Sequence, residues 1–219
     1  MNNNITKIIL IRHGQSIGNE KRIFLGHTDL DLTELGYKQA FATAEHLKNE
    51  KIDKIYSSDL IRALNTAIPH ANLRNMSVQT SKNLRELYVG DWEGLYVQEI
   101  IEKWGREVFE KDWHGNFGLF TFPNGENIIE GGKRFHDEVL RLCNENEGKT
   151  ILIAAHAAVI RSFWSIISLI KPKDIVEMLP FPSNASYSIA YCENGKITPF
   201  EYSIDDHLIE VGITKVTLN

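Results

Sequence analysis

Short, nearly continuous apolar runs alternate along the chain with longer amphipathic stretches. Residues 5–11 are rich in β-branched side chains and almost uninterrupted by polar ones, and residues 150–155 repeat the pattern. Runs of this kind predict strands that are buried on both faces of a sheet. Shorter strands are predicted at 54–57 and 78–80. A hairpin is predicted at 187–202, where Glu-Asn-Gly supplies the turn.

Helices are predicted between these strands, because apolar positions recur there with the spacing of one helical face. Thr33 is the predicted cap of a helix that runs to about residue 49. Ser58 or Asp59 is the predicted cap of a second helix, which ends near Pro69. The remaining predicted helices cover residues 95–103, about 127–146 and 157–170. Strands that alternate with helices predict an α/β fold with helices on both faces of the sheet.

Composition and charge narrow the class of protein. The 219 residues are 42% hydrophobic and 24% charged, which is near the average of globular proteins. No repeat, low-complexity tract or linker interrupts the pattern, so we expect one domain over residues 1–219. The formal net charge of −5 disfavours a general nucleic-acid partner, because nucleic-acid-binding domains are usually basic.

Targeting and membrane signals are weak in this sequence. The apolar run at 8–11 is too short for the core of a secretory signal. The longest apolar stretch, 151–170, is broken by a histidine and an arginine, which disfavours a membrane span. Cys143 and Cys192 are too few for a disulfide framework. The sequence therefore predicts a soluble cytoplasmic protein with no membrane association.

Three segments share the order strand, sharp turn, helix start, and each carries a cation or an imidazole at that point. They contain Arg12 with His13, Arg62, and His156. Ligands of open α/β sheets bind outside the carboxyl ends of the strands, where helix N-termini also offer free N–H groups. Taken singly, each of these residues would more often be structural. Their joint occurrence predicts that they converge on one anionic group, to which arginine can bond through two oxygens.

Short motifs follow one another in a distinctive order along most of the chain. In chain order they are Arg-His-Gly-Gln-Ser at 12–16, Leu-Thr at 32–33, Ser-Ser-Asp-Leu at 57–60, Leu-Arg-Glu-Leu at 84–87, Trp-Glu-Gly at 92–94, Gly-Glu at 125–126, Val-Ile-Arg at 159–161, Asn-Ala-Ser at 184–186 and Asp-His-Leu at 206–208. The set resembles the histidine phosphatase superfamily, in the branch of the cofactor-dependent phosphoglycerate mutases. A lone Arg-His-Gly is a weak signal, whereas the ordered set from about residue 8 to 208 is a strong one.

The resemblance implies a three-layer α/β/α sandwich with a mostly parallel central sheet, as in phosphoglycerate mutases. It also implies that His13 is the catalytic nucleophile and forms a phosphohistidine, since a neutral imidazole has a free ring nitrogen near neutral pH. Glu86 would be the general acid for the leaving group and would then activate water. No metal and no cofactor are implied.

The same resemblance implies a set of phosphate ligands. Arg12, Arg62 and His156 would hold the phosphoryl oxygens, because phosphoryl transfer depends mainly on positioning and charge stabilisation. Asn19 would add a neutral donor, and Gln15 lies close enough in the sequence to contribute another.

The residues after Glu86 favour a phosphatase over a mutase. Mutases of this family carry Glu-Arg-His-Tyr-Gly, whereas residues 86–90 read Glu-Leu-Tyr-Val-Gly, which is similar to α-ribazole phosphatases and broad-specificity phosphatases. We expect a phosphomonoester hydrolase that acts on a small phosphorylated metabolite. A cofactor-dependent phosphoglycerate mutase is one alternative. A non-catalytic phospho-ligand-binding module is another, although such a module would be expected to lack His13 or Glu86. Whether the protein forms a homodimer stays open.

Two further features bear on the site. Residues 95–125 are predicted to form a lid insertion, and 104–125 hold six of the chain's 21 aromatic side chains. An aromatic lid suggests a substrate with an apolar or ring-bearing leaving group, with ordinary packing as the alternative interpretation. Ala157 and Ala158 stand where the family often has glycine, so strain is expected if either position needs a positive φ.

Overall fold

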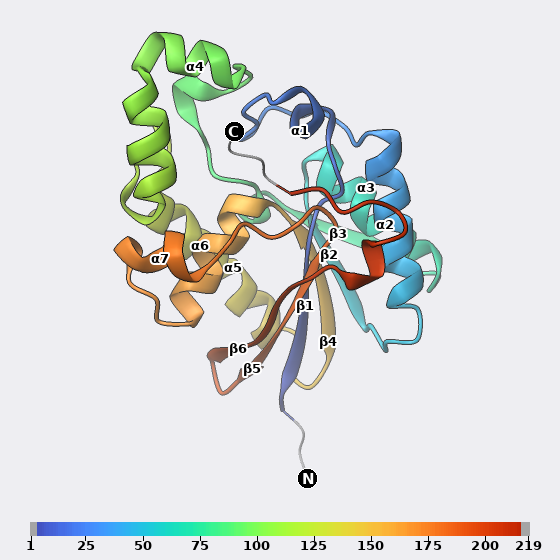
Figure 1. Ribbon diagram of the computed structural model, residues 1–219. Helices are drawn as coiled ribbons and strands as arrows, with labels where there is room; N and C mark the ends of the chain where they lie inside the picture. Colours follow the sequence, from blue (N-terminus) through green and yellow to red (C-terminus); the bar gives the residue numbers. More distant parts are fainter. Residues whose placement is uncertain (1–3, 216–219) are drawn as a thin grey trace.

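A six-stranded sheet separates two layers of helices (Figure 1). The strand order is β3-β2-β4-β1-β5-β6, with parallel pairing from β3 to β1 and antiparallel pairing from β1 to β6. The computed structural model describes residues 4–215, so the ends of the predicted domain at residues 1 and 219 lie outside this range. The three-layer α/β/α architecture with a mostly parallel sheet is confirmed.

All six predicted strands are present. They are β1 (Thr6–Arg12), β2 (Lys54–Ser58), β3 (Val78–Ser81), β4 (Thr150–Ala155), β5 (Tyr187–Glu193) and β6 (Lys196–Ile204). The two most apolar runs, β1 and β4, are central neighbours, and their parallel register places Arg12 beside Ala155. Because both strands end at the same edge of the sheet, His13 and His156 leave it side by side.

Helices cover both faces of this sheet. They are α1 (Ile17–Lys21), α2 (Glu34–His46), α3 (Ile61–Asn72), α4 (Val97–Trp104), α5 (Ile128–Asn144), α6 (Ala157–Ile167) and α7 (Ile175–Met178). Helices α5 and α6 lie on one face, and α2 and α3 lie on the other (Figure 1). The predicted cap of α2 is confirmed, since the Thr33 side chain accepts from the Gly36 N–H.

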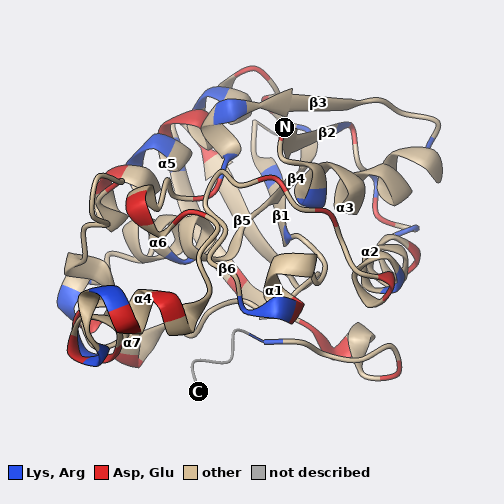
Figure 2. Cartoon of the chain, turned by 90° about the horizontal axis from the view of Figure 1, so that it is seen from above, with Lys and Arg blue, Asp and Glu red and all other residues tan. Residues whose placement is uncertain are grey.

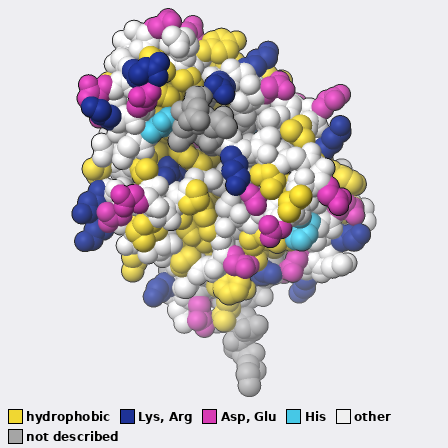
Figure 3. Space-filling model, viewed as in Figure 1, with side chains coloured by type: hydrophobic (Ala, Val, Ile, Leu, Met, Phe, Trp, Pro, Cys, Tyr) yellow, Lys and Arg dark blue, Asp and Glu magenta, His cyan; other side chains and the backbone are white. Residues whose placement is uncertain are grey.

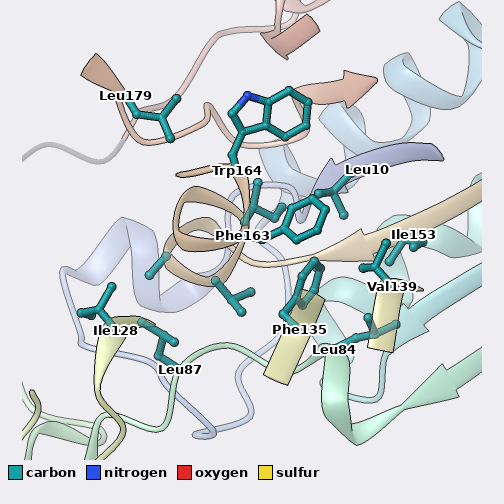
Figure 4. Packing of buried hydrophobic residues seen from close by; sticks show 14 of the residues in the cluster. Leu10, Leu84, Leu87, Ile128, Phe135, Val139, Ile153, Phe163, Trp164 and Leu179 are labelled. Carbon is teal, nitrogen blue, oxygen red and sulfur yellow. The ribbon is translucent and has the colours of Figure 1, made fainter. Parts of the chain in front are cut away.

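The core follows from the alternation of side chains along the strands. Leu10 faces α5 and α6, whereas its neighbours Ile9 and Ile11 face the opposite layer. On the first face Phe135 of α5 and Phe163 of α6 meet edge to face at 5.4 Å (Figure 4). Burial of these strands on both faces explains why residues 8–11 of β1 and 151–155 of β4 are all apolar.

The structure corrects both ends of the predicted helix around Arg62. Leu60, and neither Ser58 nor Asp59, is the N-cap of α3, and its side chain makes no capping bond. The carboxylate of the distant Asp29 accepts from the Ile61 N–H at 2.8 Å and replaces a local cap.

The C-terminal end of α3 also lies beyond its predicted position. Pro69 is inside the helix, which continues to Asn72. The carbonyl of Pro69 still accepts from the Leu73 N–H at 3.1 Å, so the last turn closes although the proline ring removes one donor.

Several other boundaries differ from the sequence predictions. Helix α6 ends at Ile167 rather than near residue 170, and Leu169 adopts a left-handed φ of 57° that a helix cannot continue. The short helices α1 and α7 and a π-helical segment at Val108–Gly115 were not predicted. Elements of one or two turns are too short to show a helical period in the sequence.

The surface agrees with the overall charge balance. On the face shown in Figure 3, Lys and Arg side chains are interspersed with Asp and Glu. Within residues 4–215, no helix has both the length and the apolar character that crossing a membrane requires.

We predict that His70 makes the protein less stable in mild acid. His70 is fully buried in α3, neither ring nitrogen has a hydrogen-bond partner within residues 4–215, and burial lowers its pKa to about 3. The unfolded chain therefore binds one more proton than the folded one between the ordinary histidine pKa and about 3. Stability is full above the ordinary value and falls by up to about 1.4 kcal/mol per pH unit below it.

The variant His70→Leu removes this proton and is expected to flatten the dependence of the unfolding free energy on pH. Urea denaturation at a series of pH values from about 7 to about 4 measures the slope. A variant with the same slope as the wild type would contradict the assignment.

Candidate active site

The four predicted basic residues meet at the carboxyl edge of the sheet. Arg12 ends β1, His13 follows it, Arg62 lies in the first turn of α3, and His156 precedes α6. All four are buried, with at most 4% of the side chain exposed. Figure 2 looks down on this edge, with basic positions coloured blue among β1, β4 and α3. The predicted convergence on one place is therefore what the fold produces.

A pocket opens at this edge, with about 970 Å³ of empty space that is partly open to solvent. Its lining includes five of the seven residues predicted from the sequence, namely Arg12, His13, Asn19, Arg62 and Glu86. His156 lies directly behind the lining, where its ring meets that of His13 edge to face at 5.3 Å. Gln15 is not part of the lining, and its amide oxygen accepts from the Thr33 hydroxyl at 2.8 Å.

His13 is held in one tautomer. Its Nδ1 lies 2.7 Å from the carbonyl oxygen of Gly14, which can only accept, so Nδ1 carries the proton. Nε2 is left with its lone pair. Burial lowers the pKa of His13 well below its ordinary value, and the nearby charges of Arg62 and Arg12 lower it further. The ring is therefore neutral at physiological pH and its Nε2 is able to act as a nucleophile.

Arg62 is oriented by a loop that a carboxylate holds from behind. Its guanidinium donates to the carbonyls of Thr28 at 2.9 Å and Gly26 at 2.8 Å. Glu93 fixes this loop by accepting from the N–H groups of His27 at 2.7 Å and Thr28 at 2.8 Å. Burial lowers the pKa of Arg62 to about 10, so the group remains charged at neutral pH.

Arg12 and His156 have polar atoms that the protein itself does not satisfy. Arg12 donates from Nη1 to the carbonyl of Pro182 at 2.7 Å, and burial lowers its pKa to about 10. Its Nε and both ring nitrogens of His156 are buried without a hydrogen-bond partner among the residues that the structure describes. Unpaired buried donors are rare in folded proteins, and an anion bound between these two side chains would accept from Arg12 Nε and from the one N–H of the neutral His156 ring.

The carboxylate of Glu86 is buried against the N-terminus of α6. Its Oε1 accepts from the N–H groups of Val159 at 2.8 Å and Leu87 at 3.0 Å, and its Oε2 accepts from the N–H of Ala158 at 3.0 Å. The side chain is 8% exposed and also lines the pocket. The carboxylate thus supplies the acceptors that the first turn of α6 needs, and Oε2, which accepts only one of these bonds, has a lone pair left for another.

The backbone at the start of α6 shows whether Ala157 and Ala158 are strained. Ala157 and Ala158 are the first two residues of α6, and neither has a positive φ. The strain considered for these positions does not arise, because an ordinary helix start needs no glycine.

The side chain of Asn19 is held in place by two hydrogen bonds to its amide oxygen. Its Oδ1 accepts from the Ser16 N–H at 3.1 Å and from the side-chain amide of Asn184 at 3.0 Å. Asn184 donates also to the carbonyl of His13 at 3.1 Å, so it links the two residues. With its oxygen occupied on this side, the amide NH₂ of Asn19 is the group that remains for a ligand in the pocket.

Some pocket residues were not predicted as site residues. Arg22, which follows α1, and Lys215, in the C-terminal segment, line the pocket. Asn184 holds Thr214 by accepting from its hydroxyl at 3.1 Å, which brings that segment to the site. No strand-end pattern marks either basic residue, so the sequence carries no signal for them. Across residues 4–215, no cluster of three or more His, Cys, Asp or Glu side chains is arranged to hold a metal ion.

Comparison with known proteins places this arrangement in a family. Residues 8–204 match the model of the histidine phosphatase superfamily, branch 1. The chain belongs to the histidine phosphatase superfamily. That match covers the carboxyl ends of the strands that carry the site, and it includes the site residues described above except Thr214 and Lys215.

The superfamily relatives have more than one activity. A metal-independent phosphoserine phosphatase of Arabidopsis thaliana is 30% identical over 210 residues, covering 95% of this chain and 85% of the relative. A 2,3-bisphosphoglycerate-dependent phosphoglycerate mutase of Bartonella tribocorum is 33% identical over 176 residues, covering 77% and 84%. Among solved structures, YhfR of Bacillus stearothermophilus superposes with a TM-score of 0.86 at 26% identity, covering 93% of this chain and 99% of that one.

We predict that Glu86 stabilises the fold of this histidine phosphatase by capping α6. The variant Glu86→Leu leaves the N–H groups of Ala158 and Val159 without an acceptor and is expected to lower the unfolding free energy by about 1–3 kcal/mol. Chemical denaturation measures the difference. Glu130→Leu, which removes an exposed carboxylate from the first turn of α5, is the matched control and should change stability by about 0.5 kcal/mol or less. Equal losses in the two variants would contradict the capping role.

Proposed function

We propose that this histidine phosphatase hydrolyses phosphomonoesters of small metabolites through a phosphohistidine on His13. The observation that carries the proposal is the neutral His13 ring, whose Nε2 lone pair shares one pocket with two buried guanidinium groups and a buried carboxylate. A nucleophile, a clamp for phosphoryl charge and a proton carrier are the parts that hydrolysis of a phosphate ester needs.

In the first step Nε2 of His13 attacks phosphorus, and the bond between phosphorus and the ester oxygen breaks. Arg12, Arg62 and His156 stabilise the charge on the phosphoryl oxygens, because buried donors act there with little screening by water. Asn19 adds its amide NH₂. Gln15 receives no part in this step, since its side chain bonds to Thr33 outside the pocket lining.

Glu86 moves the protons. When it carries a proton on Oε2, it gives that proton to the leaving alkoxide as the ester bond breaks. A water molecule then enters in place of the alcohol, gives a proton back to Glu86 and attacks phosphorus. The bond between Nε2 and phosphorus breaks, inorganic phosphate leaves, and the His13 lone pair is restored. Each turnover consumes one water and yields one alcohol and one phosphate.

The relatives support hydrolysis of a phosphate ester as the type of reaction. The phosphoserine phosphatase of Arabidopsis thaliana is similar over 95% of this chain, and its name describes hydrolysis of a small phosphorylated metabolite without a metal. The mutase relative makes phosphoglycerate mutase activity the second candidate. Interconversion of phosphoglycerates that depends on a bisphosphorylated primer would favour that activity over hydrolysis.

We predict that His13 becomes phosphorylated during turnover. Quenching of the enzyme with a ³²P-labelled ester in alkaline detergent should trap a label on His13 that is stable in base and lost in acid, because phosphoramidate bonds hydrolyse in acid. The variant His13→Ala should lose both label and phosphate release. His136→Ala, which alters a half-exposed histidine of α5 outside the pocket lining, is the control and should keep both. A label on any other residue would overturn the mechanism.

We predict that Glu86 matters most for esters of poor leaving groups. Glu86→Gln keeps an acceptor for the α6 N–H groups but carries no transferable proton. It should slow an alkyl phosphate by about 10²–10⁴-fold and p-nitrophenyl phosphate far less, because nitrophenolate leaves without a proton. Steady-state kcat for the two esters gives the comparison. Equal slowing of both would show that Glu86 is not the acid.

A further inference from the structure

We infer that the alcohol part of the substrate is apolar and about the size of an aromatic ring. The inference rests on the proposed hydrolase function and concerns the half of the pocket that lies beyond the phosphate clamp. That half is bounded by a surface that we call the apolar wall, which consists of Phe24, Val97, Phe109, Trp113, Phe122 and Phe181.

The apolar character begins next to the proton carrier. Leu87 and Val89, which follow Glu86 in the chain, line the pocket together with Leu25. Leu87 and Val89 are buried, at 0% and 3% exposure. The leaving oxygen has to lie within hydrogen-bond reach of Glu86, so the carbon chain attached to it enters an apolar surrounding at once. A leaving group with polar atoms on its first carbons would lose hydration beside Leu25, Leu87 and Val89 without gaining partners from their side chains.

The side chains of the apolar wall are packed by neighbouring rings. Trp113 packs against Phe122 at 5.0 Å and against Phe24 at 5.6 Å, and Phe24 meets Trp92 edge to face at 5.1 Å. Phe181 is held on its other face by Arg161, whose guanidinium lies 4.3 Å from the ring centre. Phe109, Trp113 and Phe122 are at most 5% exposed, so a ligand contacts the wall mainly through the partly exposed Phe24, Val97 and Phe181. The buried rings are already in place behind this surface, which favours binding.

The cations on this side of the pocket are poorly suited to a small carboxylate substrate. Besides Arg12 and Arg62, the pocket-lining Arg and Lys residues within 4–215 are Arg22 and Lys215, and both are exposed. Water and salt screen exposed charges, so such cations bind a carboxylate weakly. His114 also lines the pocket, and burial lowers its pKa, so its ring is neutral near pH 7. The carboxylate of a phosphorylated hydroxy acid or amino acid would therefore be bound weakly, and such a substrate would leave the apolar wall uncovered.

The test uses esters of primary alcohols, whose leaving groups have similar basicity, so that differences report the pocket. Ethyl phosphate, hexyl phosphate, 2-phenylethyl phosphate and O-phosphoserine are compared by phosphate release. We expect kcat/KM to rise by about tenfold or more from ethyl to 2-phenylethyl phosphate, because several buried carbons each contribute. O-phosphoserine should lie close to ethyl phosphate. A higher kcat/KM for O-phosphoserine than for 2-phenylethyl phosphate would overturn the inference and leave the hydrolase function standing.

Variants test whether the preference for 2-phenylethyl phosphate over ethyl phosphate depends on the apolar wall. Phe181→Ala should reduce the advantage of 2-phenylethyl over ethyl phosphate by about fivefold or more. Val97→Thr keeps the shape of a half-buried residue but adds a hydroxyl, so it tests the same point if Phe181→Ala does not fold. Phe200→Ala alters a ring that is 63% exposed on β6 and is the matched control. An unchanged advantage in both wall variants would contradict the inference.

Binding separates this inference from the proposed function. Ethylphosphonate and 2-phenylethylphosphonate cannot be hydrolysed, and calorimetry measures their affinities directly. Tighter binding of the phenylethyl compound, with loss of that difference in Phe181→Ala, supports the apolar wall even if no ester is turned over. Absence of turnover for every ester would overturn the hydrolase function alone. Equal affinities for the two phosphonates would overturn the inference alone.

Discussion

Two buried guanidinium groups at one sheet edge are the constraint on which the rest of the site depends. Arg12 and Arg62 repel each other and have lost most of their contact with water, so the fold must supply acceptors and a countercharge. Carbonyl groups of Pro182, Thr28 and Gly26 supply the acceptors, and Glu86 supplies the charge. The same pair of cations disfavours a proton on His13, so the arrangement that is costly to bury is also the one that keeps the nucleophile neutral.

The supports of this site come from distant parts of the chain. Glu93 holds the loop that receives Arg62, and Asn184 ties the carbonyl of His13 to the side chain of Asn19. Each of these bonds joins segments that are dozens to well over a hundred residues apart in sequence, as the His13–Asn184 pair shows with its separation of 171. The geometry of the proposed phosphate clamp is thus a property of the whole folded sheet and its loops.

The strand pattern was sufficient to predict the fold and the meeting of Arg12, His13, Arg62 and His156, because parallel strands end at a common edge. Contacts between loops could not be predicted in the same way. Asp29 replaces a local cap at α3, and Glu86 caps α6 from 72 residues away, because the acceptor for a helix N-terminus can come from any segment that the fold brings near. Gln15 is another such case, since its side-chain oxygen accepts from the Thr33 hydroxyl, and its role as a phosphate ligand stays a prediction.

The depth of the clamp has a consequence for how an ester reaches it. The positive charge of Arg12 and Arg62 is enclosed, while the chain as a whole carries a net charge of −5 and its visible surface mixes both signs. Such a molecule exerts little long-range attraction on an anion, so encounter is governed by ordinary diffusion and is insensitive to ionic strength. Selection between esters then takes place after entry, through contacts made inside the pocket.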